Sequence, residues 1–238
     1  MDIIHVSGCD LTTKSTICKF LKEKTNYEIK HFDKVKTLEE GKQQYFDFLK
    51  YEHNKNYICD RFHDGEWVYA PLYRNYKGNY LNEIENELRK FPYLFVNTYC
   101  DIDVIEERLR QREEKYVKTE DFKTILDSFY DYTMEQNMPY LRINTNIADS
   151  EKYANYILKC FNIIKEIFKE NTKNDIYCGN FEAKNLVVIS DKIFFDEIKY
   201  ELINNGVYEN CWMSTNNDKK FINKTKKLLP NITNVKKF

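Results

Sequence analysis

The segment Gly8–Ser15 contains residue types whose spacing suits phosphate binding. It reads Gly-Cys-Asp-Leu-Thr-Thr-Lys-Ser and matches the pattern G-x-x-x-x-G-K-[ST], except that Thr13 stands at the second glycine. In such a loop, backbone N–H groups surround phosphate oxygens, the lysine neutralises the transferred group and the hydroxyl ligates Mg²⁺. We therefore expect Lys14 to be catalytic and Ser15 to be a metal ligand. The residues expected to bind the phosphates of ATP are Gly8, Cys9, Asp10, Leu11, Thr12, Thr13, Lys14, Ser15 and Thr16.

Thr13 is the residue that departs from the pattern. A β-branched side chain disfavours the positive φ that glycine adopts freely, so the loop geometry depends on how Thr13 is accommodated. The hydroxyl groups of residues 12–16 could also simply cap a helix, which is the alternative explanation of this cluster. Its position favours phosphate binding, because an apolar run at 3–7 precedes the loop and a helical pattern at 15–24 follows it.

The elements that must position this loop alternate between strands and helices. Short apolar runs predict strands at 3–7, 27–32, 56–59, 93–99 and 140–144. Helical spacing predicts helices at 15–24, 38–51, 80–90, 103–112, 121–136 and 150–168, with Thr37 and Glu40 as a capping pair. The segment 62–79, which holds Gly65, Pro71 and Gly78, indicates a loop. This alternation predicts an α/β fold in which helices cover both faces of a five-stranded parallel sheet.

Charged residues follow the third predicted strand and occupy the helix after the fourth. Asp60 and Arg61 lie at a strand end, where open α/β sheets bind ligands, although a surface Asp-Arg turn is the alternative. Arg108 and Arg112 are four residues apart and share one helix face. They either face a ligand or pair in solvent with the neighbouring glutamates at 106, 107, 113 and 114.

Two further segments carry candidate residues for a second substrate. In 62–74, aromatic rings could stack on a base and charged groups could read its edges, although core packing is the alternative for each ring. The candidates there are Glu66, Trp67, Tyr69 and Arg74. After the second strand, Asp33 could act as a general base toward a hydroxyl, whereas Lys34 and Lys36 could hold a phosphate. The sequence leaves both chemistries open at this turn.

Composition sets limits on partners and environment. The 238 residues include 37 Lys+Arg and 38 Asp+Glu, so only the basic C-terminal end could favour nucleic acid. No segment approaches the ~18–20 apolar residues of a membrane span, and the N-terminus does not resemble a signal peptide. We therefore expect a cytoplasmic protein, in the host cytoplasm if the gene is viral. Seven cysteines without paired spacing, beside four histidines, predict reduced thiols and no zinc site.

A polar segment at 169–175 indicates a division of the chain. Residues 1–170 form the predicted phosphate-binding domain, and residues 176–238 form a small α/β unit. In that unit, the pattern predicts strands at 185–190 and 209–214 and helices at 194–205 and 218–229, with Gly206 ending the first helix. It contains no catalytic motif. We hypothesise that this unit mediates docking or dimerisation. In the second case the protein would form a homodimer.

These features together resemble the thymidylate kinase and deoxynucleoside kinase branch of the P-loop kinases, in particular short phage-type thymidylate kinase-like proteins. The resemblance covers about residues 1–168. Its carriers, in order and in the matching strand-to-helix turns, are Gly8-Cys9-Asp10, Lys14-Ser15-Thr16, Asp60-Arg61, the run 65–74, and Arg108 with Arg112. It implies a three-layer P-loop kinase fold that uses ATP and Mg²⁺.

The resemblance also implies roles for single residues. Arg61 contacts the phosphate that is attacked, Asp60 organises Mg²⁺ and water, and Asp10 faces the sugar 3′-hydroxyl. Arg108 and Arg112 belong to a lid over the γ-phosphate. We therefore predict phosphoryl transfer from ATP to a deoxynucleoside monophosphate, dTMP first, in nucleotide biosynthesis. A deoxynucleoside kinase acting on a 5′-hydroxyl is one alternative, and a nucleotide-binding regulator that has lost catalysis is another.

Overall fold

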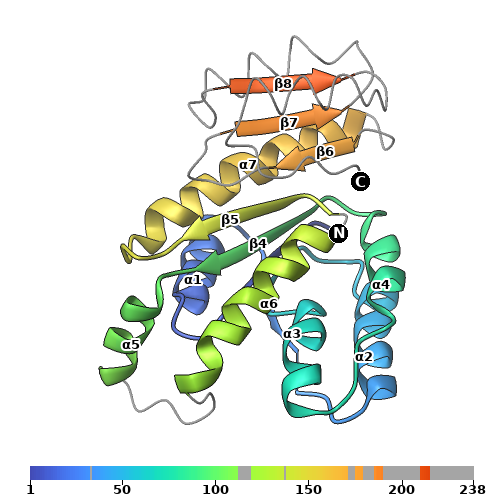
Figure 1. Cartoon of the computed structure of the whole chain (residues 1–238). Helices are drawn as coiled ribbons and strands as arrows, with labels where there is room; N and C mark the ends of the chain where they lie inside the picture. The colour runs from blue at the N-terminus through green and yellow to red at the C-terminus, as the bar shows by residue number, and fades with distance from the viewer. Residues whose placement is uncertain are drawn as a thin grey trace.

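A parallel five-stranded sheet forms the centre of the N-terminal part of the chain (Figure 1). The computed structural model describes residues 1–32, 34–111, 119–136, 138–170, 175–178, 185–189 and 210–214. The strands are β1 (Ile3–Gly8), β2 (Glu28–His31), β3 (Tyr57–Asp60), β4 (Tyr93–Tyr99) and β5 (Tyr140–Asn144). Their order is β2-β3-β1-β4-β5, and every pairing is parallel. The α/β class and the five predicted strands are confirmed.

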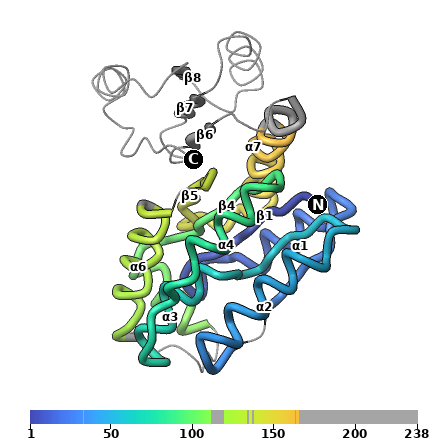
Figure 2. The backbone as a smooth tube through the Cα atoms, turned by 90° about the vertical axis from the view of Figure 1, so that its right-hand side faces the viewer, coloured from blue at the N-terminus to red at the C-terminus, as the bar shows by residue number. Residues whose placement is uncertain are grey.

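Helices cover both faces of this sheet. They are α1 (Lys14–Lys24), α2 (Leu38–Tyr51), α3 (Asp64–Tyr73), α4 (Leu81–Leu88), α5 (Ile102–Arg110), α6 (Phe122–Glu135) and α7 (Ser150–Glu170), with a short 3₁₀ turn at Thr119–Asp121. Figure 2 shows α1 and α7 together on one side of the sheet and α3 and α6 on the other. The predicted cap of α2 is confirmed, since the Thr37 hydroxyl accepts a 3.2 Å hydrogen bond from the Glu40 N–H.

The two faces of the sheet follow the two-residue period of a strand. Ile4 and Val6 of β1 pack with α1 and α7, whereas Ile3 packs with α2 and α4. A third apolar cluster lies beyond the carboxyl ends of the strands and joins Cys9 and Leu11 of the β1–α1 loop to α3, α5 and α6. This cluster fixes the base of the loop against three helices.

The prediction of a loop over 62–79 is wrong, because α3 occupies residues 64–73. Gly65 and Pro71 are poor helix formers, and Pro71 removes one backbone N–H donor inside the helix. Tertiary packing supplies the stability, since Val68 and Ala70 are buried. A local hydrogen bond supports the start of the helix, where the Asp64 carboxylate accepts a 3.3 Å bond from the Phe62 N–H. The predicted helix over 103–112 ends at Arg110 within the described residues, and Arg112 lies outside them.

The C-terminal part contains a second sheet of three described strands. These are β6 (Asp175–Cys178), β7 (Asn185–Ile189) and β8 (Asn210–Ser214), with β6 antiparallel to β7 and β7 parallel to β8. The strands predicted at 185–190 and 209–214 are confirmed, and β6 was not predicted. The helices expected at 194–205 and 218–229, and Gly206, lie outside the described residues. The division into two domains stays a prediction.

Within the described ranges, no helix combines the length and apolar character needed to cross a membrane. The five cysteines of residues 1–170 are free and buried.

Candidate functional site

The loop of residues 8–15, here called the phosphate loop, turns sharply between β1 and α1. Three of its residues adopt positive φ: Gly8 at 137°, Leu11 at 65° and Thr13 at 60°. A Cβ atom on Gly8 would lie 2.1 Å from the Thr98 carbonyl oxygen, so only glycine fits there. The Thr12 hydroxyl donates to the Cys9 carbonyl at 2.6 Å and lies 2.8 Å from the Thr98 hydroxyl, which fastens the loop to β4.

Thr13 takes the left-handed conformation that a glycine would take, with φ 60° and ψ 14°, at the N-cap of α1. Its carbonyl accepts hydrogen bonds from the Thr16 and Ile17 N–H groups, both at 3.1 Å, so the helix starts normally. Its side chain makes no capping bond, and its hydroxyl oxygen is buried without a hydrogen-bond partner among the described residues. Thr13 is therefore accommodated at the expense of a strained conformation and an unsatisfied hydroxyl.

Lys14 lies inside the phosphate loop and is only 5% exposed. Its Nζ donates to the Cys9 carbonyl at 2.5 Å and lies 3.8 Å from Oδ1 of Asp10. Burial lowers the pKa of the Lys14 ammonium, and Asp10 opposes this shift. A buried ammonium beside the loop amides is a compact positive charge of the kind that can neutralise a phosphate.

Ser15 and Asp60 form a pair next to Lys14. The Ser15 hydroxyl donates a 2.8 Å hydrogen bond to Oδ2 of Asp60, which is buried at the end of β3. His31 also lies near this pair, with Nδ1 3.7 Å from Oδ2 of Asp60. A hydroxyl and a carboxylate at this position are hard oxygen donors and fit Mg²⁺.

Arg61 leaves the sheet directly after Asp60. Its φ of 67° turns the side chain toward the phosphate loop, while its N–H still donates to the Val6 carbonyl at 3.0 Å. The guanidinium is 51% exposed and forms an ion pair with Asp10. Burial disfavours the charge on Arg61, but Asp10 together with Tyr69, Asp60 and Asp64 outweighs burial and raises the pKa of the guanidinium. Strain of this kind at a strand end is a frequent feature of functional sites.

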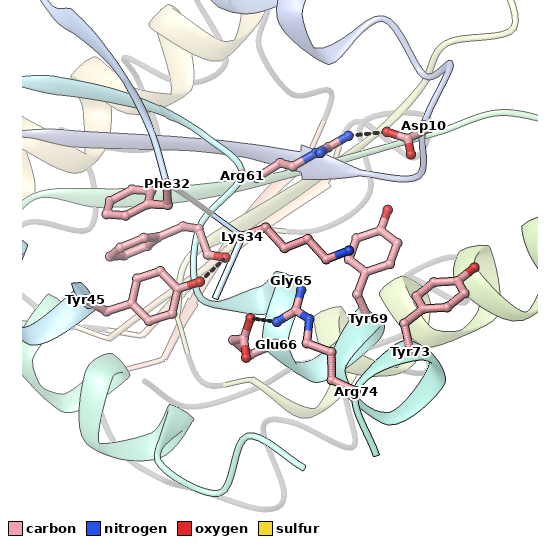
Figure 3. Close-up of a pocket in the computed structure, with 11 residues that line it drawn as sticks. Asp10, Phe32, Lys34, Tyr45, Arg61, Gly65, Glu66, Tyr69, Tyr73 and Arg74 are labelled. Carbon is pink, nitrogen blue, oxygen red and sulfur yellow. Dashed lines mark hydrogen bonds and ion pairs between the residues drawn. The ribbon is translucent and has the colours of Figure 1, made fainter. Parts of the chain in front are cut away.

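A cleft of about 280 Å³, here called the aromatic cleft, opens beside Asp10 and Arg61. Figure 3 shows side chains from the ends of β1, β2 and β3, and from α2 and α3, that converge on it. Its lining comprises Asp10, Phe32, Lys34, Tyr45, Arg61, Phe62, Gly65, Glu66, Tyr69, Tyr73 and Arg74. The cleft lies next to β1 at the carboxyl ends of the strands. Open α/β sheets bind their ligands at this edge.

Glu66 and Arg74 form an ion pair in the wall of this cleft (Figure 3). The Glu66 carboxylate also accepts a hydrogen bond from the Tyr76 hydroxyl, so both of its oxygens have donors. Burial alone would lower the pKa of Arg74, but its interactions with Tyr76 and Glu66 together raise that pKa. The remaining donors of the Arg74 guanidinium include Nε, which is buried without a hydrogen-bond partner in the described part of the chain.

The structure brings together Asp10, Arg61, Glu66, Tyr69 and Arg74, five of the predicted substrate residues. Trp67 does not line the cleft, since it packs in the core at 6.0 Å from the Tyr132 ring. Lys36 does not line it either, and its N–H donates to Glu40. Asp33 and Arg112 lie outside the described residues.

Arg108, predicted to act in a lid, lies at the other side of the phosphate loop. It donates to the Leu11 carbonyl at 2.8 Å and to the Thr145 carbonyl at 2.5 Å. Its guanidinium is half-buried and does not line the aromatic cleft. A direct role for Arg108 at phosphate stays a prediction.

The sequence reasoning missed Phe32 and Tyr45 as cleft residues. Phe32 follows β2 directly, so the rule that ligands gather at strand ends could have found it. Tyr45 lies within α2, where the local sequence does not distinguish a cleft residue from a core residue. Its ring packs edge-on against Phe62 at 5.1 Å, a contact set by the tertiary fold.

The sheet order, the flanking helices and the phosphate loop together define an α/β protein with the fold of P-loop kinases. YorR, an SPbeta prophage-derived uncharacterized protein of Bacillus subtilis (strain 168), is 27% identical over 165 residues, which cover 66% of this chain and 98% of YorR. No family model matches the chain.

Solved structures show the same fold. The crystal structure of Bacillus subtilis YorR in complex with phosphorylated GDP has a TM-score of 0.59 at 24% identity and covers 71% of this chain and 98% of that chain. Polyphosphate kinase 2 from Arthrobacter aurescens TC1 has a TM-score of 0.55 at 12% identity and covers 69% and 68%, respectively.

Proposed function

We propose that this chain is a kinase that transfers the γ-phosphoryl group of ATP to a deoxynucleoside monophosphate. The proposal rests on the position of the aromatic cleft, because the cleft begins at Asp10 of the phosphate loop. Its lining combines three cations with several aromatic rings. Donor and acceptor bound in these adjoining sites would meet near Lys14 and Arg61. Phosphoryl transfer depends on this kind of positioning and on charge stabilisation.

The charges in the aromatic cleft favour a phosphate-bearing acceptor over a nucleoside. Arg61 pairs with Asp10 and Arg74 pairs with Glu66, whereas Lys34 forms no ion pair with the described residues. The lining therefore carries one positive charge in excess. Both of its carboxylates are engaged with arginines, which makes them poor general bases for a nucleoside hydroxyl.

On the donor side, Lys14 and the loop amides would hold the phosphates of ATP. Ser15 and Asp60 would hold Mg²⁺, which supplies charge neutralisation for the phosphate oxygens. Arg61, pointing from the strand end toward Asp10, would hold the acceptor phosphate between the two sites.

The size and lining of the cleft favour a pyrimidine nucleotide as the acceptor, and dTMP is the first candidate. Its volume of about 280 Å³ lies at the small end for ligand pockets. Tyr69 and Tyr73 are stacked with an interplanar angle of 20° and offer a face to a base. YorR was solved with a guanine nucleotide, so dGMP is the competing acceptor to test.

Coupled assays over the four common deoxynucleoside monophosphates and their nucleosides, with ATP and Mg²⁺, test the proposal. We expect turnover of a monophosphate. Turnover of a nucleoside alone would identify a deoxynucleoside kinase, and calorimetric binding of ATP without any turnover would identify a regulator. Absence of ATP binding would exclude all three.

Lys34 gives a sharper test of the acceptor site. Replacement of Lys34 by Ala should raise the KM for the monophosphate at least about 10-fold, the scale of one charge-assisted hydrogen bond, with little change in the KM for ATP. Lys50→Ala, at an exposed position near the end of α2, is the matched control. Equal KM values for Lys34→Ala and the control would remove Lys34 from the acceptor site.

A further inference from the structure

Arg108 connects three segments that are distant in the sequence. Its Nη1 donates to the Leu11 carbonyl in the phosphate loop at 2.8 Å and contacts Cys100 Sγ at 3.6 Å. Its Nη2 donates to the carbonyls of Thr145 and Asn146 at 2.5 and 3.4 Å. The guanidinium therefore bridges the phosphate loop, the end of β4 and the turn between β5 and α7.

The anchor of Arg108 on the β5 side is itself fixed. The Thr145 N–H donates to the Tyr99 carbonyl at 2.7 Å, and the Asn146 side chain exchanges hydrogen bonds of 2.7 and 2.9 Å with Asp101. A planar guanidinium held by carbonyls at such a turn is a rigid support, because its donors have a fixed geometry. Arg108 thus holds Leu11 from outside the phosphate loop.

The bond to Leu11 acts on a strained peptide. Leu11 has a φ of 65°, which a non-glycine residue adopts only when its surroundings impose it. Because a trans peptide places its C=O and the next N–H on opposite sides, the bond to the Leu11 carbonyl also sets the direction of the Thr12 N–H. That N–H is one of the loop amides expected to face phosphate.

We propose that Arg108 is a positioning residue that holds the phosphate loop in its binding conformation, through the Leu11 carbonyl, and does not itself contact the transferred phosphate. The proposal rests on the proposed function in so far as the loop binds ATP. The support from Arg108 is important because of Thr13. Two non-glycine residues in the loop are left-handed, so this loop depends on an external support more than a loop with glycine at position 13 would.

The experiment compares Arg108→Ala and Arg108→Lys in the wild-type and Thr13→Gly backgrounds, with Arg110→Ala as control. Arg110 is exposed on the same helix, and its Nε donates to the Glu106 carbonyl. The Kd for ATP·Mg²⁺ by calorimetry, kcat, and the urea midpoint of unfolding are measured on each protein.

We expect Arg108→Ala to raise the Kd for ATP about 10-fold, the scale of losing hydrogen bonds from a charged donor, and in the Thr13→Gly background only about 3-fold. Arg108→Lys should not restore binding, since one ammonium cannot span the carbonyls of Leu11 and Thr145. A loss confined to kcat, or rescue by lysine, would show direct action on phosphate and overturn the proposal.

The proposed function and this inference fail separately. If the wild-type protein binds no ATP, the kinase proposal fails, and the unfolding midpoints still decide the role of Arg108. Coupled effects of Arg108→Ala and Thr13→Gly on the midpoint support loop positioning, because the two residues then act on one strained element. Additive effects would overturn it.

Discussion

The Ser15 hydroxyl donates a 2.8 Å hydrogen bond to Oδ2 of Asp60, although 45 positions separate the two residues. The sheet creates this contact, because β1 pairs in parallel with β3 and places Val6 opposite Asp60. The first helical turn after β1 therefore meets the carboxyl end of β3. This relationship predicts a shared task for a hydroxyl and a carboxylate that the sequence places far apart.

Asp60→Asn should raise the Mg²⁺ concentration needed for half-maximal turnover about 10-fold or more, the scale seen when a metal-site partner is lost. The asparagine keeps an oxygen that can accept from Ser15, so the fold should be retained. Asp103→Asn, at an exposed position in α5, is the control. Titration of turnover with Mg²⁺ decides the case, and unchanged Mg²⁺ dependence in Asp60→Asn would exclude a metal role.

Lys14→Ala should lower kcat at least ~10²-fold, the scale found when one preorganised charge is removed from a site of charge development. The ammonium is buried against the Cys9 carbonyl, so its removal also frees that carbonyl. Lys14→Arg should not rescue turnover, because a planar guanidinium does not fit a place shaped for a compact charge.

Melting temperature and kcat should be measured on the same preparations of the Lys14 variants. A folded Lys14→Ala protein with near wild-type turnover would contradict the kinase proposal.

Local sequence signals recovered most of the fold and the phosphate loop. The strands have apolar runs, and Thr37 with Glu40 marked the start of α2 at the correct residue. The features that the sequence did not predict depend on tertiary structure. α3 contradicts its local glycine and proline signals, because burial of Val68 and Ala70 outweighs intrinsic propensity. Local sequence signals also did not predict contacts between segments that are distant in the chain.

Two such contacts shape the candidate site. The bond from Arg108 to Leu11 spans 97 positions, and the place of Tyr45 in the aromatic cleft depends on how α2 packs against Phe62. Pattern and spacing along the chain carry no information on such pairs, because they arise only when the sheet order is known.

Thr13→Gly should raise the free energy of unfolding by about 0.5–1 kcal/mol. It removes both a left-handed β-branched residue and a buried hydroxyl that has no partner among the described residues. The gain is partly offset by the greater freedom of glycine in the unfolded chain. Thr13→Ala removes the hydroxyl but keeps the φ strain, so it should gain less.

Urea unfolding of the two Thr13 variants measures the difference. A larger stabilisation by alanine than by glycine would mean that the left-handed conformation carries no strain.

His63 is fully buried, and its Nε2 lies 2.9 Å from the Tyr132 hydroxyl, which in turn donates to Glu85 at 3.0 Å. Burial lowers the pKa of His63 from 6.5 to about 3, and the nearby His5 acts in the same direction. As the pH falls below 6.5, the unfolded chain takes up a proton at His63 that the folded protein does not bind until about pH 3. The folded state must therefore lose stability over this range, at up to about 1.4 kcal/mol per pH unit.

Asp64 adds to this loss only at lower pH. Burial raises its pKa, but interactions with His5, Ser7 and His63 together outweigh burial and lower the pKa from 3.8 to about 2. The window between pH 6.5 and 4 thus reports on His63, and His63→Gln, which keeps a donor for Tyr132, should flatten the fall of the urea midpoint there. His53→Gln, at an exposed position, should leave the wild-type slope unchanged. Parallel slopes for His63→Gln and wild type would show that another group titrates in this window.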